Sequence, residues 1–205
     1  MRNIQNGVNV DQLMSTVDAI QDNPDLARFQ FRAKSEWGGG GRAKTSIKSF
    51  YGAGQEDTSR DAPFIVEADE PPVLLGDNHA PNAVELVLSA LTSCLTVGFA
   101  YNAATQGVKL NSLEFGMEGD VDLRGFLGMS GSMRPGFENI QVTCRVSSDA
   151  TPEKLNEIWE HVQRTSPVLD ICCNPVPVTL TLEQVMPENA AGGERQESLS
   201  AASES

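Results

Sequence analysis

A nearly uninterrupted apolar segment, Val84 to Ala104, constrains the fold of this 205-residue chain more than any other feature. It reads VELVLSALTSCLTVGFAYNAA, and its one charged residue is Glu85. As a helix it would extend roughly 30 Å, the thickness of a bilayer core. A membrane span is disfavoured because no basic residue lies close to either end and because the segment contains several polar residues, Ser89, Thr92, Ser93 and Thr96. We therefore expect a core helix buried on all sides, with no membrane partner. In a domain this small, that burial requires a sheet wrapped around the helix and a second subunit on its other side.

The charge balance excludes several partners. The chain has 15 basic and 28 acidic residues, a net charge of −13. Nucleic acid needs clusters of Lys and Arg, which this sequence lacks, and an anionic membrane surface would repel the chain. Four cysteines are too few for a disulfide scaffold. The start of the chain does not read as a signal peptide, so we expect a cytoplasmic protein whose cysteine chemistry is catalytic rather than structural.

The chain divides into three parts. Residues 1–26 form an N-terminal extension with an amphipathic helix over 10–22, N-capped by Asn9 and ended at Asn23-Pro24. Residues 27–186 form the folded domain. Residues 187–205 are mostly Ala, Gly, Ser and Glu, which predicts a disordered acidic tail.

Within the domain, hydrophobic patterns predict an α+β fold. The second helix has an N-cap at Thr151 and Pro152 at its first position. Strands and helices follow the order βββ-α-ββ-α-β, which differs from the strict alternation of a parallel sheet. The predicted strands are 28–36, 43–51, 62–68, 112–123, 137–147 and 176–185, and the predicted helices are 82–104 and 152–164.

Cys94 lies inside the apolar segment, where an isolated cysteine is more often a small buried residue than a reactive one. A nearby cation would change that interpretation by favouring the thiolate. Metal binding has little support, because the two histidines, His79 and His161, belong to no CxxC or HxxxH pattern. We expect no metal and no cofactor.

Several motifs, in their order and spacing, resemble those of the OsmC/Ohr family (osmotically inducible protein C and organic hydroperoxide resistance proteins). The resemblance covers roughly residues 27–185. It implies an OsmC-like α+β fold, in which antiparallel sheets wrap around long buried central helices of an intertwined homodimer, with sites at the subunit interface. The matching pieces are Gly40-Gly41-Arg42, Pro81 to Glu85, Ala90 to Cys94, Ser166-Pro167-Val168 and the final Pro-Val-Pro-Val-Thr.

The resemblance implies thiol-dependent reduction of organic hydroperoxides to alcohols. Cys94 corresponds to the peroxidatic cysteine and Arg42 to the arginine that holds the thiolate and the peroxide oxygen. The family's glutamate falls at Val84, one residue before Glu85. Glu85 therefore either pairs with Arg42 through a bend or is a first-turn acid favoured by the helix dipole.

The resolving cysteine of the family corresponds to Ser166, which cannot form a disulfide and reads as a helix N-cap. Cys172 and Cys173 follow six and seven residues later, and in a helix Cys172 would be displaced by roughly 9–10 Å. Three alternatives stay open: Cys172 or Cys173 resolves, an external thiol or dithiol does, or the peroxidase activity is lost. Cys144 reads as a core residue. The rival function is a non-catalytic protein that binds a small apolar ligand in the same pocket.

Overall fold

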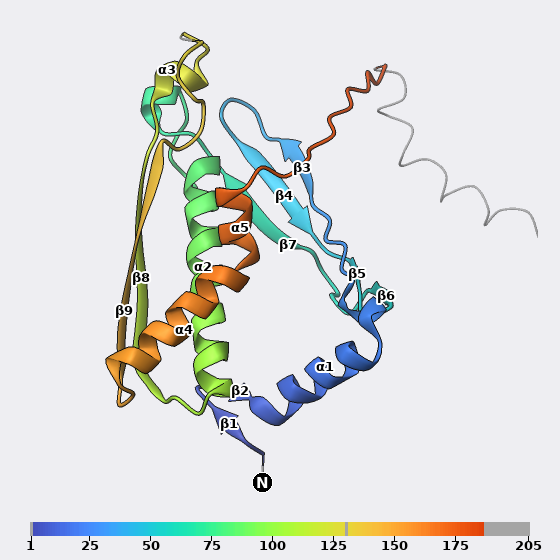
Figure 1. The fold of residues 1–205 in the computed structure, drawn as a ribbon. Coiled ribbons are helices and arrows are strands. Elements are labelled where there is room, and N and C mark those ends of the chain that lie inside the picture. Colours follow the sequence, from blue (N-terminus) through green and yellow to red (C-terminus); the bar gives the residue numbers. More distant parts are fainter. Residues whose placement is uncertain (1, 130, 187–205) are drawn as a thin grey trace, which may run out of the picture. The chain divides into compact units, whose positions relative to one another are not determined.

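A long helix, α2 (Ala83–Thr105), runs through the larger of the two units into which the chain divides, Met1–Cys173 and Asn174–Ser205 (Figure 1). The computed structural model describes residues 2–129 and 131–186. The helix starts with a capping box. The Asn82 side chain accepts the Glu85 N–H at 2.9 Å, and the Glu85 carboxylate accepts the Asn82 N–H at 2.8 Å. Two N–H groups at the start of the helix are satisfied in this way, and the predicted helix is confirmed to within a residue.

One face of α2 packs against a two-stranded antiparallel sheet and two helices. The sheet pairs β8 (Leu110–Asp120) with β9 (Asn139–Ser148). The helices are α4 (Pro152–Thr165), N-capped by Thr151 as predicted, and α5 (Pro167–Cys173). Along β9, alternate residues pack against the core, so the alternating pattern did identify this strand: Ile140, Val142, Cys144 and Val146.

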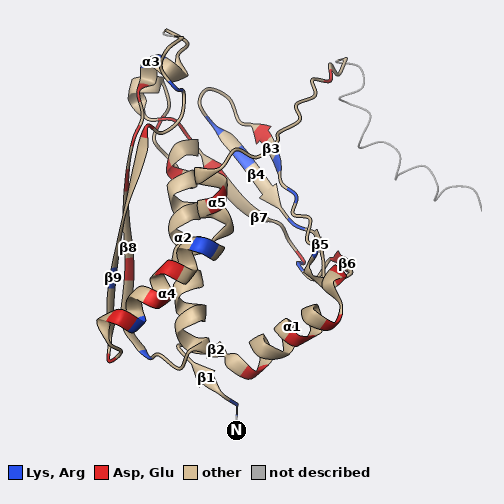
Figure 2. Cartoon of the chain, in the orientation of Figure 1, with Lys and Arg blue, Asp and Glu red and all other residues tan. Residues whose placement is uncertain are grey.

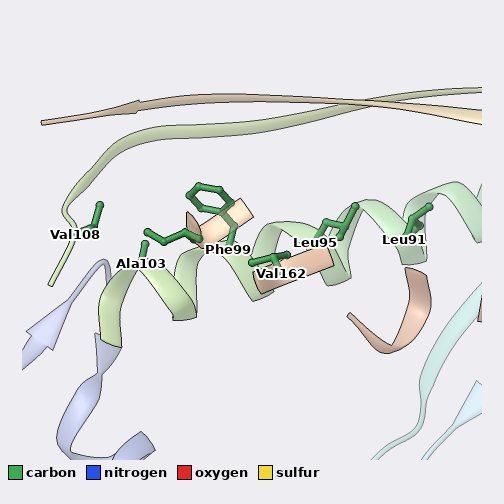
Figure 3. Close-up of a cluster of buried hydrophobic side chains, with 7 residues drawn as sticks. Leu91, Leu95, Phe99, Ala103, Val108 and Val162 are labelled. Carbon is green, nitrogen blue, oxygen red and sulfur yellow. The ribbon is translucent and has the colours of Figure 1, made fainter. Parts of the chain in front are cut away.

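The core follows a four-residue spacing along α2 (Figure 3). Leu91, Leu95, Phe99 and Ala103 are each at most 1% exposed, and Ile158 and Val162 of α4 pack against them. Residues four apart lie on one face of a helix, so this burial is one-sided.

The other face of α2 is open. Val97 is 51% exposed and Tyr101 45%. The two-stranded sheet and the two helices thus cover one side of α2, and the expectation that a second subunit covers the other side stays a prediction. Among the described residues, α2 is also the one helix long and apolar enough to cross a membrane, with 17% of its most apolar stretch buried. Buried core helices pass the same test of length and composition.

A second, antiparallel sheet has the order β3 (Lys34–Trp37), β4 (Ala43–Ile47), β7 (Phe64–Ala68), and a hairpin joins β5 (Phe50–Gly52) to β6 (Gln55–Asp57). The predicted strand 28–36 is shorter than expected. Its first half makes only an isolated bridge to Tyr51, and its aromatic rings, Phe29 and Phe31, pack on Phe50 instead. The predicted strand 43–51 is divided between β4 and β5.

The N-terminal segment forms a small hairpin, β1 (Ile4–Gln5) and β2 (Val8–Asn9), followed by α1 (Val10–Asp22) and a 3-10 turn, η1 (Pro24–Ala27). The predicted helix 10–22 and its cap are confirmed, since the Asn9 side chain accepts the Gln12 N–H at 3.1 Å. The Asn6 amide sits between the two short strands. It donates to the Val108 carbonyl and accepts the Leu110 N–H, both at 2.9 Å, which ties the hairpin to the start of β8.

The predicted final strand, 176–185, is wrong. Residues 174–186 form neither helix nor strand, and the alternating apolar residues are exposed: Val176 51%, Val178 75%, Leu180 89% and Leu182 97%. Alternation fits a strand only when a neighbouring strand accepts its backbone hydrogen bonds. The short helix α3 (Leu123–Phe126) was not predicted, and of α5 only the N-cap, Ser166, was. The predicted tail, 187–205, lies outside the described residues.

Candidate functional site

Cys94 makes a specific polar contact in the middle of α2. Its Sγ lies 3.2 Å from the Oγ of Ser166, and Cys94 itself is partly buried. Ser166 is only 6% exposed and stands at the junction of α4 and α5. Its N–H donates to the Val162 carbonyl at 2.9 Å, and its Oγ accepts the Leu169 N–H at 3.2 Å. The predicted N-cap role is confirmed, and the contact with Cys94 agrees with the resemblance, in which Ser166 stands at the position of the resolving cysteine.

The contact has a defined direction once Cys94 is ionised. A thiolate has no proton, so it can only accept, and the Ser166 hydroxyl must then donate to it. Because the Leu169 N–H already occupies one lone pair of Oγ, the hydroxyl hydrogen is left to point at sulfur. A thiolate that accepts such a bond beside an apolar core is suited to nucleophilic chemistry.

Cys172 and Cys173 lie at the end of α5 and are exposed. They line a cavity of about 420 Å³ together with Val87 and Leu91 of α2, one to two turns before Cys94. Burial, reinforced by the neighbouring thiol of Cys173, raises the pKa of Cys172. Burial likewise raises the pKa of Cys144 on β9. Cys144 thus packs in the core as predicted and is disfavoured as a thiolate.

Arg42 forms an exposed ion pair with Asp77. The guanidinium is 49% exposed and the carboxylate 58%. Arg42 closes the turn between β3 and β4, where the Gly38 N–H donates to the Arg42 carbonyl at 2.9 Å. Gly39 and Gly40 have φ angles of 91° and 57°, a left-handed conformation that favours glycine.

The loop that carries Asp77 is held by a buried carboxylate. Asp69 is 2% exposed and accepts the N–H groups of Glu70, Asp77 and His79 at 2.9, 3.1 and 3.0 Å. These hydrogen bonds, that of His79 above all, hold the pKa of Asp69 below its usual range. Neither acid was predicted from the sequence as a partner, although a buried acid needs such donors.

Asp69, Asp77 and His79 also bring one ligand atom each within 4.8 Å of one another. The loop hydrogen bonds and the ion pair with Arg42 account for this cluster, so we assign no metal site to it. The expected absence of a metal stays a prediction.

Glu85 serves in the capping box of α2 and borders a largely apolar cavity of about 470 Å³. Of the two roles considered for Glu85, the part of the chain that the structure describes shows the one in the first turn of the helix and no pairing with Arg42. Among the described residues, neither a hydrogen bond nor an ion pair joins Arg42 to Glu85 or to Cys94. The predicted site residues thus fall into separate places: Cys94 with Ser166, Arg42 with Asp77, Glu85 with Asn82, and the cysteine pair at the end of α5.

The acidic residues do not gather at one place. They are spread over several elements, including α1 and α4 (Figure 2). The net charge of −13 therefore does not mark a binding surface on the described part of the chain.

Comparison with known proteins gives a family and a fold. The family model described as OsmC-like protein matches residues 76–181, more than half of the chain, a segment that contains Cys94 and Ser166 and excludes Arg42. The structure of an OsmC-like protein from Mycoplasma pneumoniae is similar, with a TM-score of 0.55, 12% identity and coverage of 71% of this chain and 89% of that one. A protein from Psychrobacter arcticus 273-4, described by its osmotic stress induction and detoxification response, gives 0.51 at 13% identity, covering 68% and 85%. At these identities the likeness shows the fold alone. No curated protein sequence matches the chain.

Proposed function

Because the chain belongs to the OsmC-like family, we propose that it reduces organic hydroperoxides to alcohols with Cys94 as the nucleophile. The observation that carries the proposal is the contact of the Cys94 sulfur with a buried hydroxyl beside an apolar core. Such surroundings combine a donor for an anionic sulfur with neighbours that favour an alkyl peroxide, namely Leu91, Leu95 and Val97.

The reaction follows from thiolate chemistry. The Cys94 thiolate attacks one peroxide oxygen, so that an S–O bond forms while the O–O bond breaks. The alkoxide leaves and takes a proton to become the alcohol, and Cys94 is left as a sulfenic acid. In this proposal Arg42 supplies positive charge to the peroxide oxygen. To do so it must leave Asp77, a movement that the glycines at 38–41 favour.

The proposal includes a homodimer with the site at the subunit interface. The exposed apolar face of α2, with Val97 and Tyr101, is the surface that we assign to the second subunit. Val97→Glu would place a charge there and is expected to turn the dimer into a monomer in light scattering. A wild-type monomer in water, or a protein recovered with membranes, would contradict this part of the proposal.

Thiol counting tests the chemistry directly. Cumene hydroperoxide added to the reduced protein should rapidly remove one thiol per chain, and mass spectrometry should place the change at Cys94. Excess dithiol should restore it. Cys94→Ser should abolish peroxide consumption, whereas the matched Cys144→Ser should retain it. If the wild-type protein loses no thiol at Cys94, the peroxidase proposal is wrong.

A cavity supports apolar-ligand binding as the second candidate function, although it is not the pocket of Cys94 in which the rival function was expected. The cavity of about 470 Å³ at the start of α2 is lined by Leu74, Leu88, Phe126 and Phe137, among others. A fluorescent fatty-acid probe should bind there, and Leu88→Glu should weaken its binding. Probe binding in a protein that consumes no peroxide would favour the rival.

A further inference from the structure

Ser166 is the residue whose side chain meets the Cys94 sulfur, and its chemistry differs from that of a thiol. We propose that Ser166 positions the Cys94 thiolate as its hydrogen-bond donor, and that the oxidised sulfur is then reduced by a thiol from another molecule. The inference rests on the proposed peroxide chemistry and adds to it a positioning residue and the class of the reductant.

The Ser166 side chain is held in one orientation by its surroundings. It is only 6% exposed, and it lies where α4 ends and α5 begins. Its N–H is bound to Val162 and its Oγ to the N–H of Leu169, so both its backbone and its oxygen are fixed. A donor held in this way needs little reorganisation when the sulfur ionises.

The hydrogen bond is worth more to the thiolate than to the thiol. An uncharged thiol is a weak partner for a hydroxyl, whereas a bond to an ionised acceptor is shorter and roughly twice as strong. Since Ser166 is buried, bulk water competes little for that bond. The hydroxyl therefore favours the reactive form of Cys94 and aims its sulfur.

The other cysteines are badly placed to resolve the oxidised sulfur. Cys172 follows Ser166 by six residues, or about 9 Å along α5, while the Cα atoms of a disulfide lie within about 7 Å. Cys172 and Cys173 border a cavity with Val87 and Leu91 of α2, and Cys94 is not among the residues that line it. Cys144 packs against the core from β9. The resolving thiol must therefore come from outside the chain.

The steps balance with a thiol as the co-reactant. The external thiol attacks the sulfenic sulfur of Cys94, an S–S bond forms, and the S–O bond breaks with loss of water. A second thiol attacks the mixed disulfide, which releases the Cys94 thiol and a disulfide of the reductant. Two thiols are oxidised for each peroxide reduced.

The positioning role is tested by the pH profile of Cys94 alkylation and peroxide reduction. Ser166→Ala should slow both near neutral pH by roughly tenfold, because a hydrogen bond to a charged group is lost. The alkylation profile should shift to higher pH by about one unit. Ser166→Thr, which keeps the hydroxyl, should restore both. Thr151→Ala, which removes the N-cap of α4, is the matched control for lost capping and should shift neither. An unshifted profile in Ser166→Ala would overturn the positioning role.

The resolving step is tested by the products. Wild-type protein treated with cumene hydroperoxide and dimedone should form a dimedone adduct at Cys94. With glutathione in place of dimedone, it should form a mixed disulfide at Cys94. Ser166→Cys should instead form an internal disulfide to Cys94 and lose the dimedone adduct. Parallel assays with glutathione and with dithiothreitol distinguish a monothiol source from a dithiol source. A wild-type disulfide between Cys94 and Cys172 or Cys173 would overturn this inference while leaving the peroxidase intact. Absence of any oxidation at Cys94, in wild type and in Ser166→Cys, would overturn the proposed function itself.

Discussion

The pair Cys94–Ser166 and the pair Arg42–Asp77 are built in opposite ways. The first joins three helices beside the core and includes a residue that is 6% exposed. The second joins two surface turns, and about half of each side chain is open to solvent. Packing of large apolar residues sets the geometry of the first pair, whereas backbone hydrogen bonds to Asp69 set that of the second. A nucleophile needs a geometry fixed by core packing. A charged group that changes partners needs a position at the surface, as the Arg42–Asp77 pair has.

The largest effect is expected from the core beneath Cys94. Leu95 is fully buried and adjoins Cys94, so Leu95→Ala should lower the free energy of unfolding by about 2–5 kcal/mol. Val73, which precedes Asp77 by four residues in the sequence, is 76% exposed, and Val73→Ala should change the free energy of unfolding by less than about 0.5 kcal/mol. Urea unfolding measures both. Similar losses at the two positions would mean that the two regions do not differ in packing.

An intermediate effect is expected from Asp69, and it should depend on pH. Because the folded protein lowers the pKa of Asp69, this residue stabilises the fold above the pKa of an ordinary aspartate, about 3.9. The contribution is lost as the pH falls through the lower, folded-state value. Asp69→Asn should therefore lower the melting temperature at neutral pH, and the gap to wild type should close towards strong acid.

Asp61→Asn is the matched control, because Asp61 is an exposed acid outside this loop. It should leave the melting temperature nearly unchanged at every pH. A gap between Asp69→Asn and wild type that is constant with pH would show that the carboxylate charge of Asp69 is not what holds the loop.

The smallest effect is expected from the exposed ion pair. Asp77→Asn should cost less than about 1 kcal/mol of unfolding free energy, and added salt should abolish the difference. The same variant releases Arg42, so the peroxide reduction rate should hold or rise, while Arg42→Ala should lower it. A large loss of unfolding free energy that persists in high salt would show that the Arg42–Asp77 pair is supported like the buried Cys94–Ser166 pair.

Local signals predicted the helices well. Asn9 and Thr151, the two predicted caps, each accept an N–H of the helix that follows. Asn82, which was expected to be the first residue of the central helix, caps it instead. Partners distant in the sequence were harder to predict. The resemblance placed Ser166 at the resolving cysteine that pairs with the peroxidatic one, and its side chain does meet Cys94 across 72 positions. No pattern predicted that Arg42 would reach Asp77 across 35 positions. Apolar residues alternate both over 176–185 and along β9. The pattern corresponds to a strand in β9, where β8 lies alongside, and not over 176–185.

The side-chain amide of Asn6 has a consequence for self-association. By engaging the Val108 carbonyl and the Leu110 N–H, it occupies two backbone groups that a foreign strand would need in order to extend the sheet from this end. The N-terminal hairpin therefore blocks the first residues of β8 from pairing with a strand of another molecule. Removing the first nine residues would expose these backbone groups, and the shortened protein would be prone to edge-to-edge aggregation there.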